Sequence, residues 1–117
     1  RGSICRAARD IAHQVGARAI IVESATGKVA RAMVHFRPDV PIIAVVTSSL
    51  VCKKLCLNWG ITALIGEEKK TSDAITKQAM EKALSTGYFK KGDIVVVISS
   101  NRTAPTSSTD SLNVRIL

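Results

Sequence analysis

The chain has 117 residues, 46% of them hydrophobic, which suits one domain spanning residues 1–117 around one core. No apolar run approaches the roughly 18 residues needed to cross a bilayer, and no short apolar run follows a basic amino end, so neither a membrane protein nor a signal peptide is predicted. The net charge of +8 favours anionic partners, but only 3% of residues are aromatic, so we expect a phosphate-bearing ligand rather than a nucleic acid.

The first third of the chain predicts a helix, a strand and a second helix. Apolar residues three and four apart over residues 4–15 are typical of an amphipathic helix, and Gly16 is a normal stop. Residues 19–22 are apolar throughout, as in a strand buried on both faces. A second helix should follow Thr26-Gly27 and end at Arg37-Pro38, because a residue before proline disfavours helical geometry.

The middle of the chain repeats this alternation. Residues 41–46 form a second apolar strand, and the hydroxyls of residues 47–49 offer caps for a third helix. We expect that helix to bury Val51, Cys52, Leu55, Cys56 and Trp59. Gly60 then stops the helix, and residues 61–65 form a third strand.

The last third predicts one more helix and two strands. Residues 71–73 cap the helix and Gly87 closes it. Residues 94–98 are a strongly apolar strand. Residues 99–111 are polar and predict a loop, and residues 112–117 alternate as an edge strand does.

Helices that alternate with wholly apolar strands predict an α/β domain. The sheet should be mainly parallel with helices on both faces, because parallel strands need crossover connections. The last two strands have no helix between them, so we expect them to be antiparallel.

The three cysteines do not indicate a metal site. Cys52 and Cys56 stand four apart on the third predicted helix, where we interpret them as small buried hydrophobic residues of a protein from a reducing compartment. A zinc site favours two close pairs of ligands, yet neither His13 nor His35 lies near a cysteine in the sequence.

Ligands of open α/β sheets bind beyond the carboxyl ends of the strands, an edge that residues 23–28, 47–50, 66–71 and 99–109 should reach. The first segment contains Ser24, Ala25, Thr26, Gly27 and Lys28. Its hydroxyls, glycine and cation precede a helix whose free amides suit a phosphate.

There is a plainer interpretation of the same segment. Ser24 or Thr26 would then simply cap the helix, and Lys28, Arg31 and His35 would form a solvated basic face. No Walker A loop, dinucleotide fingerprint or nucleophile–base pair occurs, so we predict no catalytic residue.

Residues 99–109 form a long polar segment, which could close over a bound anion with Arg102 and the neighbouring hydroxyls. The alternative is a mobile surface connection.

The chain resembles the C-terminal domain of pyruvate kinases along essentially its whole length. The segments that carry the resemblance are residues 17–22, 24–28, 36–38, 41–45, 59–61 and 87–93. The resemblance implies a three-layer α/β/α fold with a five-stranded sheet of order 3-2-1-4-5, strand 5 being antiparallel.

The resemblance also implies a function. The parent enzyme moves a phosphoryl group from phosphoenolpyruvate to ADP with Mg²⁺ and usually K⁺, using a catalytic barrel that is absent here. The C-terminal domain often holds an allosteric sugar bisphosphate and contacts the barrel and other subunits. The implied effector-binding residues are Ser24, Ala25, Thr26, Gly27, Lys28, Val29, Arg102, Ser107, Ser108 and Thr109. Val29 stands where a second Ser or Thr is frequent, and residues 99–109 lack the usual glycines.

We therefore expect this chain to be the regulatory and subunit-contact domain of a cytosolic pyruvate kinase. We expect the domain to hold no cofactor and to be inactive on its own. Because the chain opens with Arg1-Gly2-Ser3 rather than methionine, we expect a piece of a longer protein or an added leading segment. Two alternatives stay open: a free-standing phosphate-ligand-binding protein of this fold, and a small basic nucleic-acid-binding module.

Overall fold

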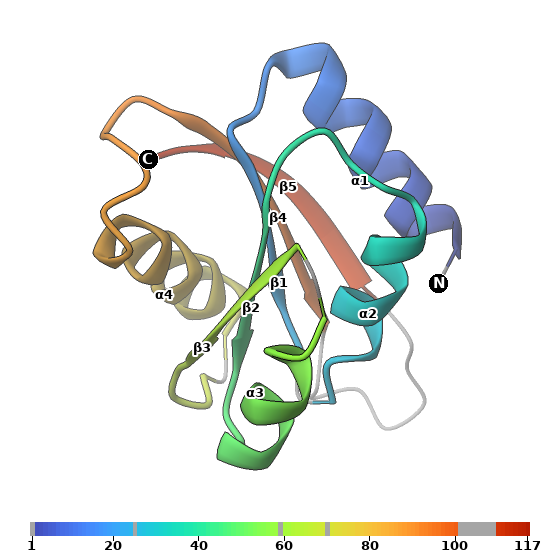
Figure 1. Cartoon of the computed structure of the whole chain (residues 1–117). Helices are drawn as coiled ribbons and strands as arrows, with labels where there is room; N and C mark the ends of the chain where they lie inside the picture. Colours follow the sequence, from blue (N-terminus) through green and yellow to red (C-terminus); the bar gives the residue numbers. More distant parts are fainter. Residues whose placement is uncertain (1, 25, 59, 70, 101–109) are drawn as a thin grey trace.

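The computed structural model describes residues 2–24, 26–58, 60–69, 71–100 and 110–117. Helices and strands alternate along most of this chain (Figure 1). In order they are α1 (Gly2–Val15), β1 (Ala19–Glu23), α2 (Lys28–His35), β2 (Ile42–Val46), α3 (Ser49–Leu55), β3 (Ile61–Ile65), α4 (Ser72–Ser85), β4 (Ile94–Ser100) and β5 (Asp110–Ile116).

The strands form one sheet of order β3-β2-β1-β4-β5, as the resemblance implied. Strand β1 lies at the centre and pairs in parallel with β2 and β4, so that Ile21 faces Ile43 on one side and Val97 on the other. Strand β5 runs antiparallel to β4, which confirms the prediction from the missing crossover helix. Each end of β1 therefore lies in the middle of a sheet edge.

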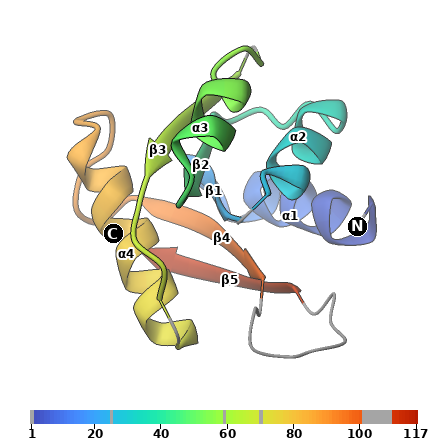
Figure 2. The same cartoon turned by 90° about the horizontal axis from the view of Figure 1, so that it is seen from below.

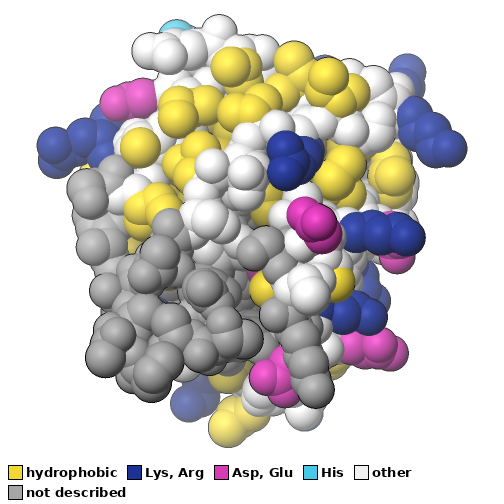
Figure 3. Space-filling view, turned by 180° about the vertical axis from the view of Figure 1, so that it is seen from behind, with side chains coloured by type: hydrophobic (Ala, Val, Ile, Leu, Met, Phe, Trp, Pro, Cys, Tyr) yellow, Lys and Arg dark blue, Asp and Glu magenta, His cyan; other side chains and the backbone are white. Residues whose placement is uncertain are grey.

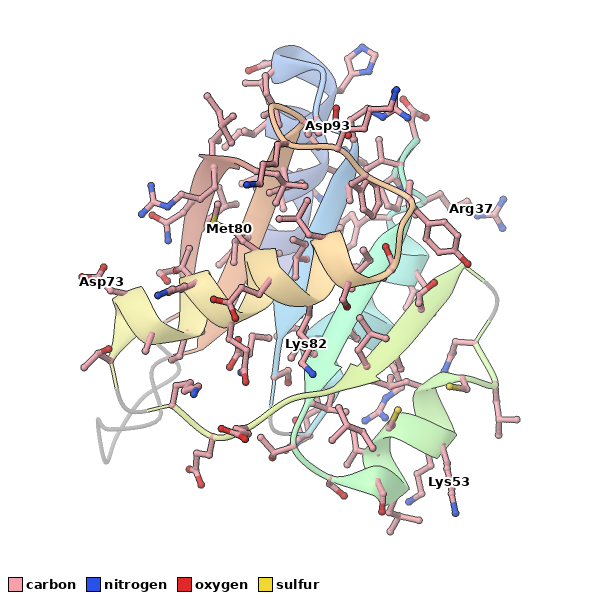
Figure 4. The ribbon with its side chains drawn as sticks, turned by 90° about the vertical axis from the view of Figure 1, so that its left-hand side faces the viewer. Arg37, Lys53, Asp73, Met80, Lys82 and Asp93 are labelled. Carbon is pink, nitrogen blue, oxygen red and sulfur yellow. The ribbon has the colours of Figure 1, made fainter. Side chains whose placement is uncertain are left out.

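The helices cover the two faces unequally. Helices α1, α2 and α3 lie on one face and α4 lies alone on the other (Figure 2). Successive side chains of β1 point to opposite faces of the sheet, so Ile20 and Val22 pack in the three-helix core while Ala19 and Ile21 pack under α4. Figure 4 shows α4 crossing the sheet, with Met80 directed toward β4 and β5. The three layers thus contain two separate apolar cores.

The predicted helix caps are present at α3 and α4. Ser48 Oγ accepts a hydrogen bond from the Val51 amide at 3.3 Å, and Thr71 Oγ1 accepts one from the Ala74 amide at 3.1 Å. Each hydroxyl satisfies an amide that the first turn of a helix leaves free. Helix α2 differs, because its cap residue is Gly27 in a left-handed conformation.

Two expectations about the third helix and the last loop are wrong in part. Of the residues expected to be buried by this helix, Leu55 is buried, Val51 and Cys52 are half-buried, and Trp59 lies outside the described residues. Cys56 is exposed, because α3 ends at Leu55 and leaves Cys56 at its cap. The predicted loop 99–111 is also shorter, because β4 continues to Ser100 and β5 begins at Asp110. The two strands continue into the polar segment, because Ser99 and Ser111 pair across the β4–β5 ladder and their hydroxyl oxygens lie 2.7 Å apart.

Candidate functional site

The candidate phosphate loop, residues 24–28, leaves the carboxyl end of the central strand β1 and leads directly into α2. This is the edge at which open α/β sheets bind ligands. Within the loop, Ser24 is buried, whereas Thr26 and Lys28 are exposed. Ala25 lies outside the described residues.

Both hydroxyls of this loop accept hydrogen bonds from the backbone of the same turn. Ser24 Oγ accepts from the Gly27 amide at 3.0 Å, and Thr26 Oγ1 accepts from the Lys28 amide at 3.3 Å. The plainer interpretation therefore describes real contacts, although the cap residue itself, Gly27, has no side chain for capping. A hydroxyl that accepts a bond retains its own O–H as a donor, so Thr26 can still donate to an anion.

Gly27 is required by both its conformation and its surroundings. Its φ of +77° lies in the left-handed region that residues with a Cβ rarely adopt. A Cβ at this position would also lie 3.2 Å from Leu55 Cδ1 and 3.2 Å from Val51 Cγ1 of α3. Leu55 is wholly buried and has little room to move away. Helix α3 therefore supports the loop from beneath and fixes the path of its backbone.

The other predicted site residues fall into two groups. Val29 is buried in the three-helix core, so its backbone alone is available to a ligand. Lys28 and His35 are exposed and Arg31 is half-buried, which gives α2 a basic side. Arg102, Ser107, Ser108 and Thr109 lie outside the described residues.

A buried polar cluster beside the loop was not predicted. Gln78 of α4 is buried, and its side-chain amide donates to Glu67 O at 2.8 Å and to Glu23 Oε1 at 3.4 Å. Its oxygen accepts from the Glu67 amide at 2.7 Å. A polar residue inside the apolar periodicity of α4, and a carboxylate ending an apolar strand, were the available signals. Gln78 thereby joins the loop after β3 to the end of β1.

The close fit around Gln78 explains a further glycine. A Cβ on Gly66 would lie 2.8 Å from Val45 Cγ1 and 3.0 Å from the Gln78 amide. The start of the loop after β3 is therefore fixed in place next to the candidate phosphate loop.

The largest hollow that we describe lies at the opposite edge of the sheet. It has a volume of about 730 Å³ and is lined by residues 37–42 with Val34 and Gly60. Arg37, at φ +45°, is one of the lining residues, and its side chain points outward from the domain (Figure 4). Because these residues precede β2 and β3, the hollow is separate from the candidate phosphate loop.

Two further properties concern the described residues only. They contain no group of three or more His, Cys, Asp or Glu side chains placed to hold a metal ion. None of their helices is both long enough and apolar enough to cross a membrane.

The sheet order and the helix layers define a three-layer α/β/α domain with its candidate site at the carboxyl end of the central strand. The family model for the pyruvate kinase alpha/beta domain matches residues 2–115. The chain belongs to this family.

Curated pyruvate kinases can be aligned with nearly the whole chain. Pyruvate kinase of Clostridium acetobutylicum is 36% identical over 113 residues, which are 97% of this chain and 23% of the relative. Pyruvate kinase of Geobacillus stearothermophilus is 30% identical over 99 residues, covering 85% of this chain and 17% of that enzyme. Pyruvate kinase of Sporosarcina psychrophila is 24% identical over 115 residues, which are 98% of this chain and 20% of that enzyme. The chain thus spans about a fifth of the length of these relatives.

The support of the loop by α3 can be tested with two glycines of nearly equal φ. Gly87, at φ +78°, has nothing within 4 Å of an added Cβ, whereas Gly27, at +77°, has Leu55 and Val51. Gly87→Ala should cost about 1–2 kcal/mol for the left-handed conformation alone. Gly27→Ala should cost a further 1–3 kcal/mol, roughly, from overpacking, measured by urea unfolding. Equal losses in the two variants would show that α3 does not constrain the loop.

Proposed function

We propose that this chain is the effector-binding and subunit-contact domain of a pyruvate kinase. The observation that supports the proposal most directly is the loop 24–28, which presents the Thr26 hydroxyl and Lys28 at the amino end of α2, on the carboxyl edge of the central strand. Membership of the pyruvate kinase alpha/beta family supplies the parent enzyme to which such a domain belongs.

The proposed ligand is a phosphorylated metabolite such as fructose 1,6-bisphosphate. One phosphate would lie against the first turn of α2, where amides without intrahelical partners and the helix dipole favour an anion. Thr26 would donate its O–H, and the ammonium group of Lys28 would add a charge-assisted hydrogen bond. The net charge of +8 would help to attract the anion over longer distances.

We assign phosphoryl transfer to the part of the parent protein that this chain does not include. Transfer from phosphoenolpyruvate to ADP, with Mg²⁺ and K⁺, would take place in a separate catalytic barrel. The present chain would act on that reaction through domain and subunit contacts.

The subunit contact that we propose involves β5. This strand is at the edge of the sheet, so one row of its backbone groups faces away from β4. Val114 and Ile116 of β5 are 41% and 65% exposed, and hydrophobic side chains gather on the face that carries this strand (Figure 3). An edge strand that carries exposed apolar side chains is suited to pairing with a second copy of the chain.

The phosphate proposal predicts a strong effect of charge reversal at Lys28. Lys28→Glu should weaken binding of fructose 1,6-bisphosphate and of inorganic phosphate at least about tenfold, because it removes a charge-assisted hydrogen bond and adds repulsion. Lys91→Glu changes the net charge equally at an exposed turn and should leave binding nearly unchanged. Isothermal titration calorimetry is the measurement. Equal affinities in all three proteins would remove the loop from consideration.

The subunit proposal predicts that Ile116→Asp reduces self-association. Placing a charge on the edge strand should raise the dissociation constant between copies about tenfold or more, as measured by sedimentation velocity over a concentration series. Leu57→Asp, at a residue 87% exposed beyond α3, is the matched control and should associate like the unchanged chain. If Ile116→Asp associated normally, β5 would not be the contact.

A further inference from the structure

Helix α3 carries two thiols one helical turn apart. Cys52 is half-buried and packs against the three-helix core, while Cys56 is exposed at the helix cap with φ −62° and ψ −17°. The Cys56 amide donates to Cys52 O at 3.0 Å, so the helical geometry continues through both residues. Both cysteines are free.

This geometry does not suit a disulfide. Side chains at positions i and i+4 of a helix have their Cβ atoms about 5–6 Å apart, whereas a disulfide needs about 3.5–4.5 Å. Residues four apart in a helix nevertheless lie on the same face, and the 3.0 Å hydrogen bond from the Cys56 amide to Cys52 O continues that geometry, so both side chains leave α3 on one side. An atom bonded to both sulfurs at about 2.3 Å, the length of a zinc–sulfur bond, spans a wider gap than an S–S bond does.

We propose that Cys52 and Cys56 form a two-thiol site that chelates a trivalent thiophilic metalloid, such as the arsenic of an organic arsenoxide. Two S–H bonds and the arsenic–oxygen bonds break, and two arsenic–sulfur bonds form. The oxygen leaves as water with both thiol protons. Arsenic stays trivalent and no electron is transferred.

The number of protein ligands selects this chemistry. Structural zinc sites need four ligands, and the described residues contain no third His, Cys, Asp or Glu that completes a metal-binding group with this pair. An organic arsenic(III) centre brings its own carbon substituent and needs only two sulfurs. Burial raises the pKa of the Cys52 thiol, and Cys56 adds to this rise, so Cys52 enters as a thiol whose proton the leaving oxygen removes.

The site is accessible from solvent. Cys56 and Leu57 are exposed, and Lys53 points from α3 away from the rest of the domain (Figure 4). The ligand would therefore meet Cys56 first and close the ring onto Cys52. Cys5, the third cysteine, is wholly buried and is separate from this pair.

Ring closure would hold the last turn of α3. That turn includes Leu55, one of the two side chains that lie under Gly27. The chelate would therefore brace the helix that supports the candidate phosphate loop. The chelation itself does not depend on whether the loop binds phosphate.

Phenylarsine oxide is the probe for this site. With the unchanged chain we expect one adduct by mass spectrometry and the loss of two titratable thiols. The adduct should resist excess glutathione but be removed by 2,3-dimercaptopropanol, because two linked bonds raise the affinity at least about a hundredfold over one. Cys56→Ser and Cys52→Ser should each lose that factor, and Cys5→Ala should bind like the unchanged chain.

Hydrogen exchange supplies a second readout that does not depend on the variants. Amides of residues 49–58 should exchange more slowly in the adduct, because the chelate links two residues one helical turn apart and restrains that turn. Undiminished affinity in Cys56→Ser with a native circular dichroism spectrum, or an adduct that glutathione displaces, would overturn the proposal. Unchanged exchange in α3 would overturn it as well.

Discussion

The packing of α3 against Gly27 is the contact on which the candidate site depends. A left-handed glycine allows the chain to turn from β1 into α2, and Leu55 and Val51 leave no space for a side chain at that position. Within this turn, the Gly27 amide donates a hydrogen bond to the Ser24 hydroxyl and the Lys28 amide donates one to the Thr26 hydroxyl. Packing in the three-helix core therefore determines how the loop presents Thr26 and Lys28 to solvent.

A second layer of contacts joins this loop to the other face of the sheet. Helix α4 is alone on that face, and its Gln78 binds both the end of β1 and the start of the loop after β3. A buried amide with several hydrogen bonds fixes orientation more strictly than apolar packing does. The carboxyl edge of the sheet is thus held from both sides, by α3 beneath the loop and by α4 through Gln78.

The architecture was predictable because local patterns determine it. Apolar runs such as residues 42–46 specify strands buried on both faces, and the missing helix between β4 and β5 specifies their antiparallel pairing. The position of Gly27 was predictable for the same reason, as a glycine between a strand and a helix. The chain order alone indicated which segments reach the ligand edge.

What escaped prediction depends on contacts between distant residues. Gln78 and Glu23 are 55 positions apart, and nothing in either local pattern indicates their pairing. Cys56 has helical spacing from Cys52, but its burial depends on where α3 ends, and local periodicity does not determine that end. The support of Gly27 by Leu55 likewise requires the fold, because the two residues lie on different strand–helix units.

We propose that a phosphate binds at the first turn of α2. The most direct measurement is a titration of the ¹⁵N-labelled chain with inorganic phosphate, followed by ¹H–¹⁵N correlation spectra. Phosphate bound at this turn should cause saturable shifts concentrated at the amides of Gly27, Lys28, Val29 and Ala30, with small changes elsewhere. Shifts confined to residues 37–42 at the opposite edge, or no saturable shift at all, would contradict it.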